Sequence, residues 1–73
     1  MITVEVFKTN VSKIKEAERV AKMLADVLPA GKISFDLEDC DRILRVEAVN
    51  GQINCQQVIT LVQKNGFACE VLS

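Results

Sequence analysis

Apolar residues alternate with polar ones in four short segments of this 73-residue chain. This period of two is typical of half-buried β-strands. The segments cover residues 2–6, 32–37, 44–48 and 67–71. Between the first and second segments, and between the third and fourth, apolar residues recur instead at helical spacing. The pattern therefore predicts the order β-α-β-β-α-β, in a single domain that spans residues 1–73.

Local signals mark the ends of both helices. Ser12 is placed to cap the start of the first helix, and Pro29 and Gly31 are placed to end it. Asn54 has the position of a capping residue for the second helix, because it precedes Gln57 by three residues. Gly66 is placed to end that helix as a left-handed C-cap. These signals bound one long helix and one short helix.

Right-handed crossovers arrange the four strands in the antiparallel order 4-1-3-2, with both helices on one face. This α+β layout is the ferredoxin-like βαββαβ sandwich. The predicted core consists of Val4, Val6, Ala21, Leu24, Phe35, Leu44, Val46, Val58, Val62 and Val71. The opposite face is expected to be wet and to carry Thr3, Glu5, Ser34, Arg45, Glu47 and Glu70.

Composition and charge exclude several classes of partner. Nine basic and ten acidic residues give a net charge of −1, whereas nucleic-acid-binding domains usually carry a basic excess. RNA-binding domains of this layout also stack bases on aromatic side chains, and this chain has no Trp or Tyr. There is no apolar run of about 18 residues and no signal-peptide pattern. We therefore predict a cytoplasmic protein that binds neither nucleic acid nor membranes.

The sequence carries no recognisable catalytic set. It has no His, no Ser-based motif and no glycine-rich phosphate loop. Ferredoxin-like acylphosphatases use an Arg and a phosphate-cradling loop, but residues 8–12 contain neither Arg nor Gly. We predict that the chain is not an enzyme and needs no cofactor.

Three cysteines, Cys40, Cys55 and Cys69, are widely separated, and neither a CxxC motif nor a His accompanies them. Cys69 is expected to point toward the core. Cys55 begins the second helix, where the helix N-terminus favours the thiolate. We expect each to be a reduced thiol that either packs in the interior or is unreactive at the surface. A redox or metal role for a pair brought together by folding stays open.

Four segments carry a resemblance to a known family. They are Phe7-Lys8-Thr9-Asn10-Val11, Phe35-Asp36, Ile43-Leu44-Arg45-Val46-Glu47 and Lys64-Asn65-Gly66-Phe67. In their order and spacing the chain resembles the heavy-metal-associated domain of copper chaperones and metal-pumping ATPases. The resemblance covers nearly the whole chain and implies the same fold.

In that family a CxxC motif between the first strand and the first helix holds a soft metal ion through two thiolates. The resemblance places those two cysteines at Lys13 and Glu16, so it implies a degenerate site that binds no metal in the family's way. Lys13 would supply a permanent positive charge in place of the ion, with Glu16 holding it at i,i+3. The simpler alternative is two solvated side chains.

Charged residues also define a candidate interaction surface. It consists of Lys8, Lys13 and Lys15 near the first loop and Asp36, Glu38, Asp39 and Asp41 near the turn between the second and third strands. Both groups are expected at the same end of the domain, where opposite charges steer a partner or promote weak self-association. The alternative is an ordinary solvated end.

These observations predict a non-catalytic protein-interaction or binding module whose partner is another protein. We expect a monomer or a weak homodimer. Two alternatives stay open. One is a heavy-metal (copper) binding or trafficking protein that uses its non-standard cysteines in a dimer. The other is a small-molecule sensor of the ACT type, which shares the topology, although such domains carry a glycine in the first loop.

Overall fold

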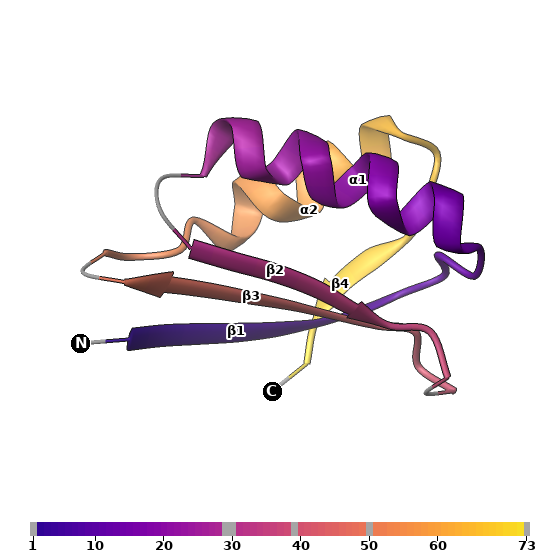
Figure 1. The fold of residues 1–73 in the computed structure, drawn as a ribbon, viewed down its shortest axis with the longest axis horizontal. Coiled ribbons are helices and arrows are strands. Elements are labelled where there is room, and N and C mark those ends of the chain that lie inside the picture. The colour runs from indigo at the N-terminus through magenta and orange to yellow at the C-terminus, as the bar shows by residue number, and fades with distance from the viewer. Residues whose placement is uncertain (1, 29–30, 39, 50, 73) are drawn as a thin grey trace.

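The computed structural model describes residues 2–28, 31–38, 40–49 and 51–72. Its elements are β1 (Ile2–Thr9), α1 (Ile14–Val27), β2 (Gly31–Asp36), β3 (Ile43–Val49), α2 (Cys55–Lys64) and β4 (Cys69–Val71). The strands form one antiparallel sheet in the order β2-β3-β1-β4, which reads 4-1-3-2 from the β4 edge. Both helices lie on the same side of this sheet (Figure 1). The structure confirms a small α+β fold with an open four-stranded sheet.

The ends of α2 follow the predicted signals. The Asn54 side chain accepts a hydrogen bond from the Gln57 amide at 3.1 Å. Gly66 has a φ of 91°, and its amide donates to the Gln63 carbonyl oxygen at 2.9 Å. A left-handed residue after a helix satisfies its last carbonyl groups, and glycine adopts this conformation without steric cost.

The ends of α1 differ from the prediction. Lys13, not Ser12, is the N-cap residue, and it makes no side-chain capping bond. Gly31 is the first residue of β2 instead of a helix terminator, and Pro29 lies outside the described residues. A Cβ atom at Gly31 would collide with the Glu47 carbonyl oxygen, so this position needs glycine because β3 approaches it closely.

The core lies between the sheet and the two helices. Its main cluster consists of Phe7, Val20, Leu24, Leu44, Val46, Val58, Val62 and Cys69. Five predicted core residues (Leu24, Leu44, Val46, Val58 and Val62) and the inward direction of Cys69 are confirmed. Phe35 and Ala21 are only half-buried, and Val71 on the short edge strand β4 is exposed.

The predicted faces of β1 are wrong. Phe7 lies opposite Leu44, so Glu5 and Thr3 point toward the helices with it, while Val4 and Val6 lie on the open face. Side chains along a strand alternate between faces, and a fully buried Phe7 fixes that alternation for the whole strand. Burial of an aromatic ring stabilises more than partial burial of valines.

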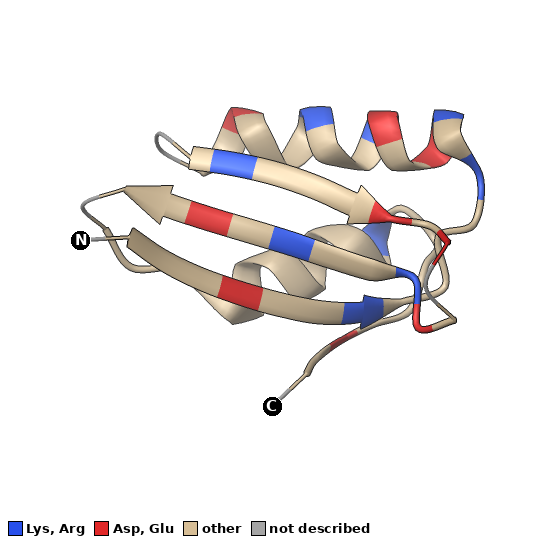
Figure 2. Ribbon diagram, turned by 60° about the horizontal axis from the view of Figure 1, so that its bottom comes forward, with Lys and Arg blue, Asp and Glu red and all other residues tan. Residues whose placement is uncertain are grey.

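The other strands follow the predicted wet face. The register places Arg45 opposite Val6 and Ser34, and Glu47 opposite Val4, all on the side away from the helices. Figure 2 looks onto the sheet from this side and marks the charged positions along its strands. The open face therefore mixes charged residues from β3 with apolar residues from β1.

Candidate functional site

The loop between β1 and α1 is held by hydrogen bonds and by one buried side chain. The nearly buried Thr9 hydroxyl donates to the Arg42 carbonyl oxygen at 2.7 Å and accepts from the Val11 amide at 3.2 Å. Val11 itself is fully buried. The Asn10 side-chain oxygen accepts a bond from the Ala68 amide at 2.7 Å. The loop therefore reaches the start of α1 along a fixed path.

Lys13 and Glu16, the positions matched to the family's cysteines, lie at the start of α1. Lys13 is exposed, and its carbonyl oxygen accepts from the Ala17 amide at 2.9 Å. Glu16 is half-buried in the first turn, where the helix dipole favours a negative charge. Within the described residues, no ion pair joins Lys13 to Glu16. An ammonium and a hard carboxylate do not fit a soft metal ion.

The structure brings one pair from the candidate charged surface together. Lys8 Nζ lies 3.8 Å from Asp41 Oδ1, and both side chains are about half exposed, so their attraction is weak. Asp36 Oδ1 accepts from the Glu38 amide at 3.2 Å and shapes the β2–β3 turn. Asp39 lies outside the described residues.

Lys13 and Lys15, the two remaining members of that surface, are exposed at the start of α1. Figures 1 and 2 place the start of α1 and the β2–β3 turn at the same end of the molecule, and Figure 2 marks charged positions in both segments. The two charged groups therefore lie at one end of the molecule, where the ion pair between Lys8 and Asp41 is weak.

Arg42 joins this turn to β1, and the sequence analysis missed it. Its φ is 47°, a left-handed conformation that is uncommon for a residue with a side chain. Its guanidinium donates to the Leu37 carbonyl oxygen at 2.7 Å, while its own carbonyl oxygen accepts from the Thr9 amide and hydroxyl. The strained conformation therefore closes the turn and holds it against β1. No local sequence pattern signals this role.

The three cysteines lie in different environments. Cys40 is exposed in the β2–β3 turn, Cys55 is half-buried at the start of α2, and Cys69 is buried at the start of β4. Among the residues that the structure describes, no three His, Cys, Asp or Glu side chains are grouped as a metal site would need.

Both inner thiols are less acidic than a free cysteine. Burial raises the pKa of Cys55, and the Glu5 carboxylate adds to this because the thiol donates to Glu5 Oε2 at 3.3 Å. Burial also raises the pKa of Cys69 to about 11, with smaller contributions from Cys55 and Glu70. The expected thiolate-favouring effect of the α2 N-terminus on Cys55 is outweighed. Neither inner thiol is poised to act as a nucleophile at neutral pH.

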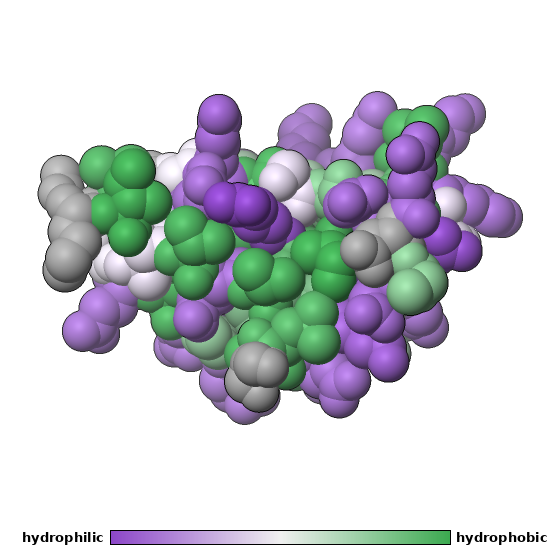
Figure 3. Space-filling model, turned by 90° about the horizontal axis from the view of Figure 1, so that it is seen from below, coloured by the Kyte–Doolittle hydropathy of each residue, from purple (hydrophilic) through white to green (hydrophobic). Residues whose placement is uncertain are grey.

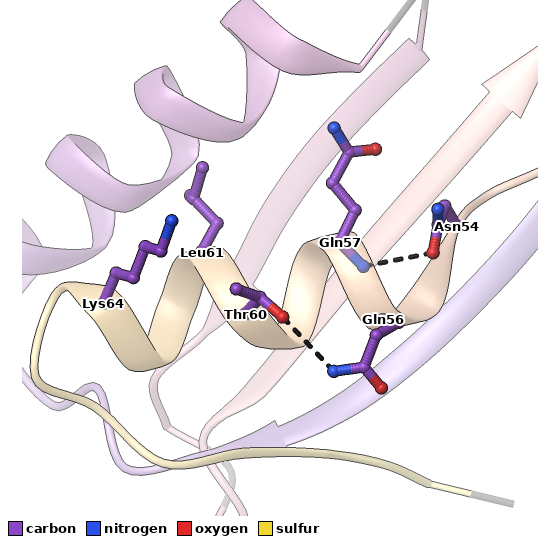
Figure 4. A pocket seen from close by; sticks show the side chains of 6 residues that line it. All are labelled: Asn54, Gln56, Gln57, Thr60, Leu61 and Lys64. Carbon is purple, nitrogen blue, oxygen red and sulfur yellow. Dashed lines mark hydrogen bonds between the residues drawn. The ribbon is translucent and has the colours of Figure 1, made fainter.

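The outer surface of α2 carries an open depression of about 520 Å³. Gln57, Leu61 and Lys64 project from one side of the helix toward α1, and Gln56 and Thr60 lie on another side (Figure 4). The Gln56 amide nitrogen donates to the Thr60 hydroxyl at 3.2 Å. Neutral amides, one hydroxyl and one lysine on a single helix provide no acid–base pair for catalysis.

The open face of the sheet exposes a group of apolar side chains, which we call the open-face patch: Ile2, Val4, Val6, Val49 and Leu72. Ile2 lies opposite Val49, and the Leu72 amide donates to the Val6 carbonyl oxygen at 2.9 Å. Seen from the open side, hydrophobic side chains gather in a continuous area with polar ones around it (Figure 3). Ile2 is 64% exposed and Val49 is 52% exposed, so water covers much of the patch.

The sequence analysis missed the open-face patch, although one signal was present. Val6 and Phe7 are adjacent and both apolar, so the alternation that begins at Ile2 breaks before the strand ends. Strand β1 therefore offers three aliphatic residues of one parity and Phe7 of the other, and only one parity can face the helices.

Comparisons with known proteins do not assign the chain to a family. No protein-family model matches the sequence, and no curated protein or solved structure matches it significantly.

Proposed function

We propose that the chain is a non-catalytic protein-interaction module that docks another protein on its open-face patch. The observation that carries the proposal is the exposure of Ile2, Val4, Val49 and Leu72 on one side of the sheet. Contiguous exposed apolar surface costs free energy in water and marks interaction sites in many proteins. A partner that covers this patch would remove that cost.

The surroundings of the patch support a protein as the partner. Arg45 and Glu47 lie beside it and form an ion pair at 3.4 Å. Lys8 lies at its other end, on the same face of β1. An apolar centre with a rim of both charges is the usual composition of a protein–protein interface. Such a rim gives orientation to a partner, whereas the apolar centre gives affinity.

The finer classification is part of the same proposal. We assign the fold as ferredoxin-like, supported by the element order and by the two helices on one face. We also propose that the chain is a heavy-metal-associated-like domain with a degenerate metal site, supported by Lys13 and Glu16 at the start of α1. Replacement of both by cysteine, Lys13→Cys with Glu16→Cys, is then expected to create Cu(I) binding. A folded double variant without Cu(I) affinity would refute this assignment.

The location of the protein and the class of its partner are also part of the proposal. No helix in the described ranges is long and apolar enough to cross a bilayer. We propose a cytoplasmic location, supported by three cysteines that are all free thiols. The near-neutral charge and the scarcity of aromatic residues argue against nucleic acid as the partner.

A photo-crosslinking amino acid at position 4 tests the docking surface in living cells. Val4 lies within the open-face patch, and Arg19 on the outside of α1 serves as the control position. We expect a discrete protein adduct from position 4 and none from position 19. The adduct should disappear when Ile2 and Val49 are changed to threonine, because the patch is then polar.

Two results would overturn the proposal. One is the same adduct from both positions, or none from position 4 in a folded protein. The other is a stoichiometric soft metal ion on the freshly purified wild-type protein by native mass spectrometry, which would favour metal trafficking.

A further inference from the structure

The outer edge of β2 is free of any strand partner in the described part of the chain. β2 is the terminal strand of the sheet, and all six of its residues pair with β3 on one side only. An unpaired edge exposes a row of backbone donors and acceptors that can extend the sheet onto another chain. Native proteins protect such edges or use them for pairing.

The charges on this strand are arranged symmetrically. Lys32 and Asp36 are exposed on the open face, two residues before and two residues after Ser34. In an antiparallel pair of two copies of β2 with Ser34 opposite Ser34, Lys32 of one copy lies opposite Asp36 of the other. The twofold axis repeats this contact, so opposite charges meet twice.

The helix-facing side of the same edge is apolar. A groove between α1 and β2 is lined by Ile14, Ala21, Ile33 and Phe35, with Glu18 beside them. Ile14 is 69% exposed, and Ile33 and Phe35 are only half-buried. The register centred on Ser34 places Ile33 of one copy opposite Phe35 of the other. Apolar contacts would then form under the strands while charge pairs form above them.

We propose that a second copy of this chain pairs along β2, giving one continuous eight-stranded antiparallel sheet with its twofold axis at Ser34. The reciprocal position of Lys32 and Asp36 favours a second copy over an unrelated peptide, because a peptide would need the same charge spacing by coincidence. The proposed edge lies on β2, whereas the open-face patch is centred on β1. The two proposals therefore fail independently.

Charge reversal tests the register. Lys32→Asp and Asp36→Lys each place like charges opposite one another twice, so each is expected to weaken self-association about tenfold or more. An equimolar mixture of the two variants restores both opposite-charge contacts, so a mixed dimer is expected. Analytical ultracentrifugation over a concentration series measures these masses. Arg19→Asp, an exposed reversal on the outer side of α1, is the matched control and should leave the dimer unchanged.

Asp36 has a second role, since its side chain accepts the Glu38 amide bond. Circular dichroism therefore checks the fold of each variant, and Asp36→Asn replaces Asp36→Lys if the latter unfolds. Asn keeps an oxygen acceptor for the turn but removes the charge that faces Lys32. We then expect a smaller loss of self-association, several-fold instead of tenfold.

Cross-linking provides an independent measurement. In a Cys40→Ser background, Ser34→Cys should be joined to a second chain by a short bismaleimide. Gln63→Cys, exposed on α2, is the control and should stay monomeric under the same conditions. A wild-type chain that is monomeric at millimolar concentration, a mixture that does not recover, or equal cross-linking at both positions would overturn the proposal. Cross-linking of Ser34→Cys in cells to a different protein, and not to itself, would do so too.

Discussion

The two faces of β1 differ in composition, and either one could have been buried against the helices. The helix-covered face holds Phe7 together with polar neighbours such as Glu5 and Thr9, whereas the open face holds three aliphatic residues. A count of apolar residues favours burying the aliphatic set. The structure instead buries Phe7 completely and leaves Val4 38% exposed. The larger ring, together with the hydrogen bonds available to the polar neighbours, decides which face turns inward.

The strongest test of this difference is a pair of adjacent truncations. Phe7→Ala is expected to lower the free energy of unfolding by about 3–5 kcal/mol, because it removes a buried ring and leaves a cavity. Val6→Ala, on the open face, should cost about 1 kcal/mol or less. Urea unfolding followed by circular dichroism measures both. Equal losses would contradict the assignment of faces.

The covered face also contains a thiol whose ionisation is linked to stability. Burial raises the pKa of Cys69 to about 11 from its ordinary value of 9.0, so the folded chain prefers the protonated thiol. The protonated thiol therefore contributes to the free energy of unfolding. This contribution is fully present below pH 9 and is lost as the pH rises from 9 to 11, because the unfolded chain releases the proton more readily. The decline should be on the order of 2 kcal/mol.

Urea unfolding at pH 8.5 and pH 10.5, in the presence of a reductant, measures this decline. Cys69→Ala should lose less stability between the two pH values than the wild-type chain. Cys40→Ala, which changes an exposed thiol on the turn, should lose as much as the wild-type chain. The reverse ranking of the two variants would disprove the linkage.

A third comparison uses neighbouring polar residues on opposite faces. Thr9→Val removes the hydroxyl that joins the Arg42 carbonyl oxygen and the Val11 amide, and should cost about 1–2 kcal/mol. Lys8→Ala removes a solvated ion pair with Asp41 and should cost less than about 0.5 kcal/mol. Thermal denaturation measures both losses of stability. A larger loss for Lys8→Ala would contradict the conclusion that the Thr9 hydrogen bonds stabilise more than the solvated ion pair.

The smallest expected effect on stability lies within the open-face patch. Val4→Thr keeps a β-branched residue in the strand and changes only an exposed apolar surface. We expect unfolding to change by less than about 0.5 kcal/mol, while binding of the cross-linked partner falls clearly. A partner that binds this variant as well as the wild-type chain would remove Val4 from the interface.

Sequence patterns were sufficient wherever one element had a single strong period. They predicted the α2 caps at Asn54 and Gly66, the antiparallel pairing of β2 with β3, and the buried face of β3. They failed at β1, because Val6 and Phe7 offer both parities and only tertiary packing chooses between them. The role of Arg42 was also hidden, because no local pattern signals its left-handed backbone and its carbonyl oxygen binds Thr9, which is distant in sequence.

The candidate site could likewise be predicted from the sequence only in part. The proposal of a degenerate metal site at Lys13 and Glu16 rests on the sequence alone, through its resemblance to the heavy-metal-associated family. The open-face patch could not be predicted in this way, since it depends on the inverted face of β1 and on Leu72 returning beside Val6. A surface formed by residues 2 and 72 together exists only after folding.

The brevity of β4 has a mechanical consequence. Within the described residues, β4 pairs with β1 only from Phe7 to Thr9, so from Ile2 to Glu5 β1 has a strand partner on one side alone. The sheet should therefore open first at this narrow end, and its amide protons should exchange with solvent fastest. A protein bound over Ile2 and Val4 would clamp the loosest part of the sheet. Docking would then be recorded as slower proton exchange in the first half of β1.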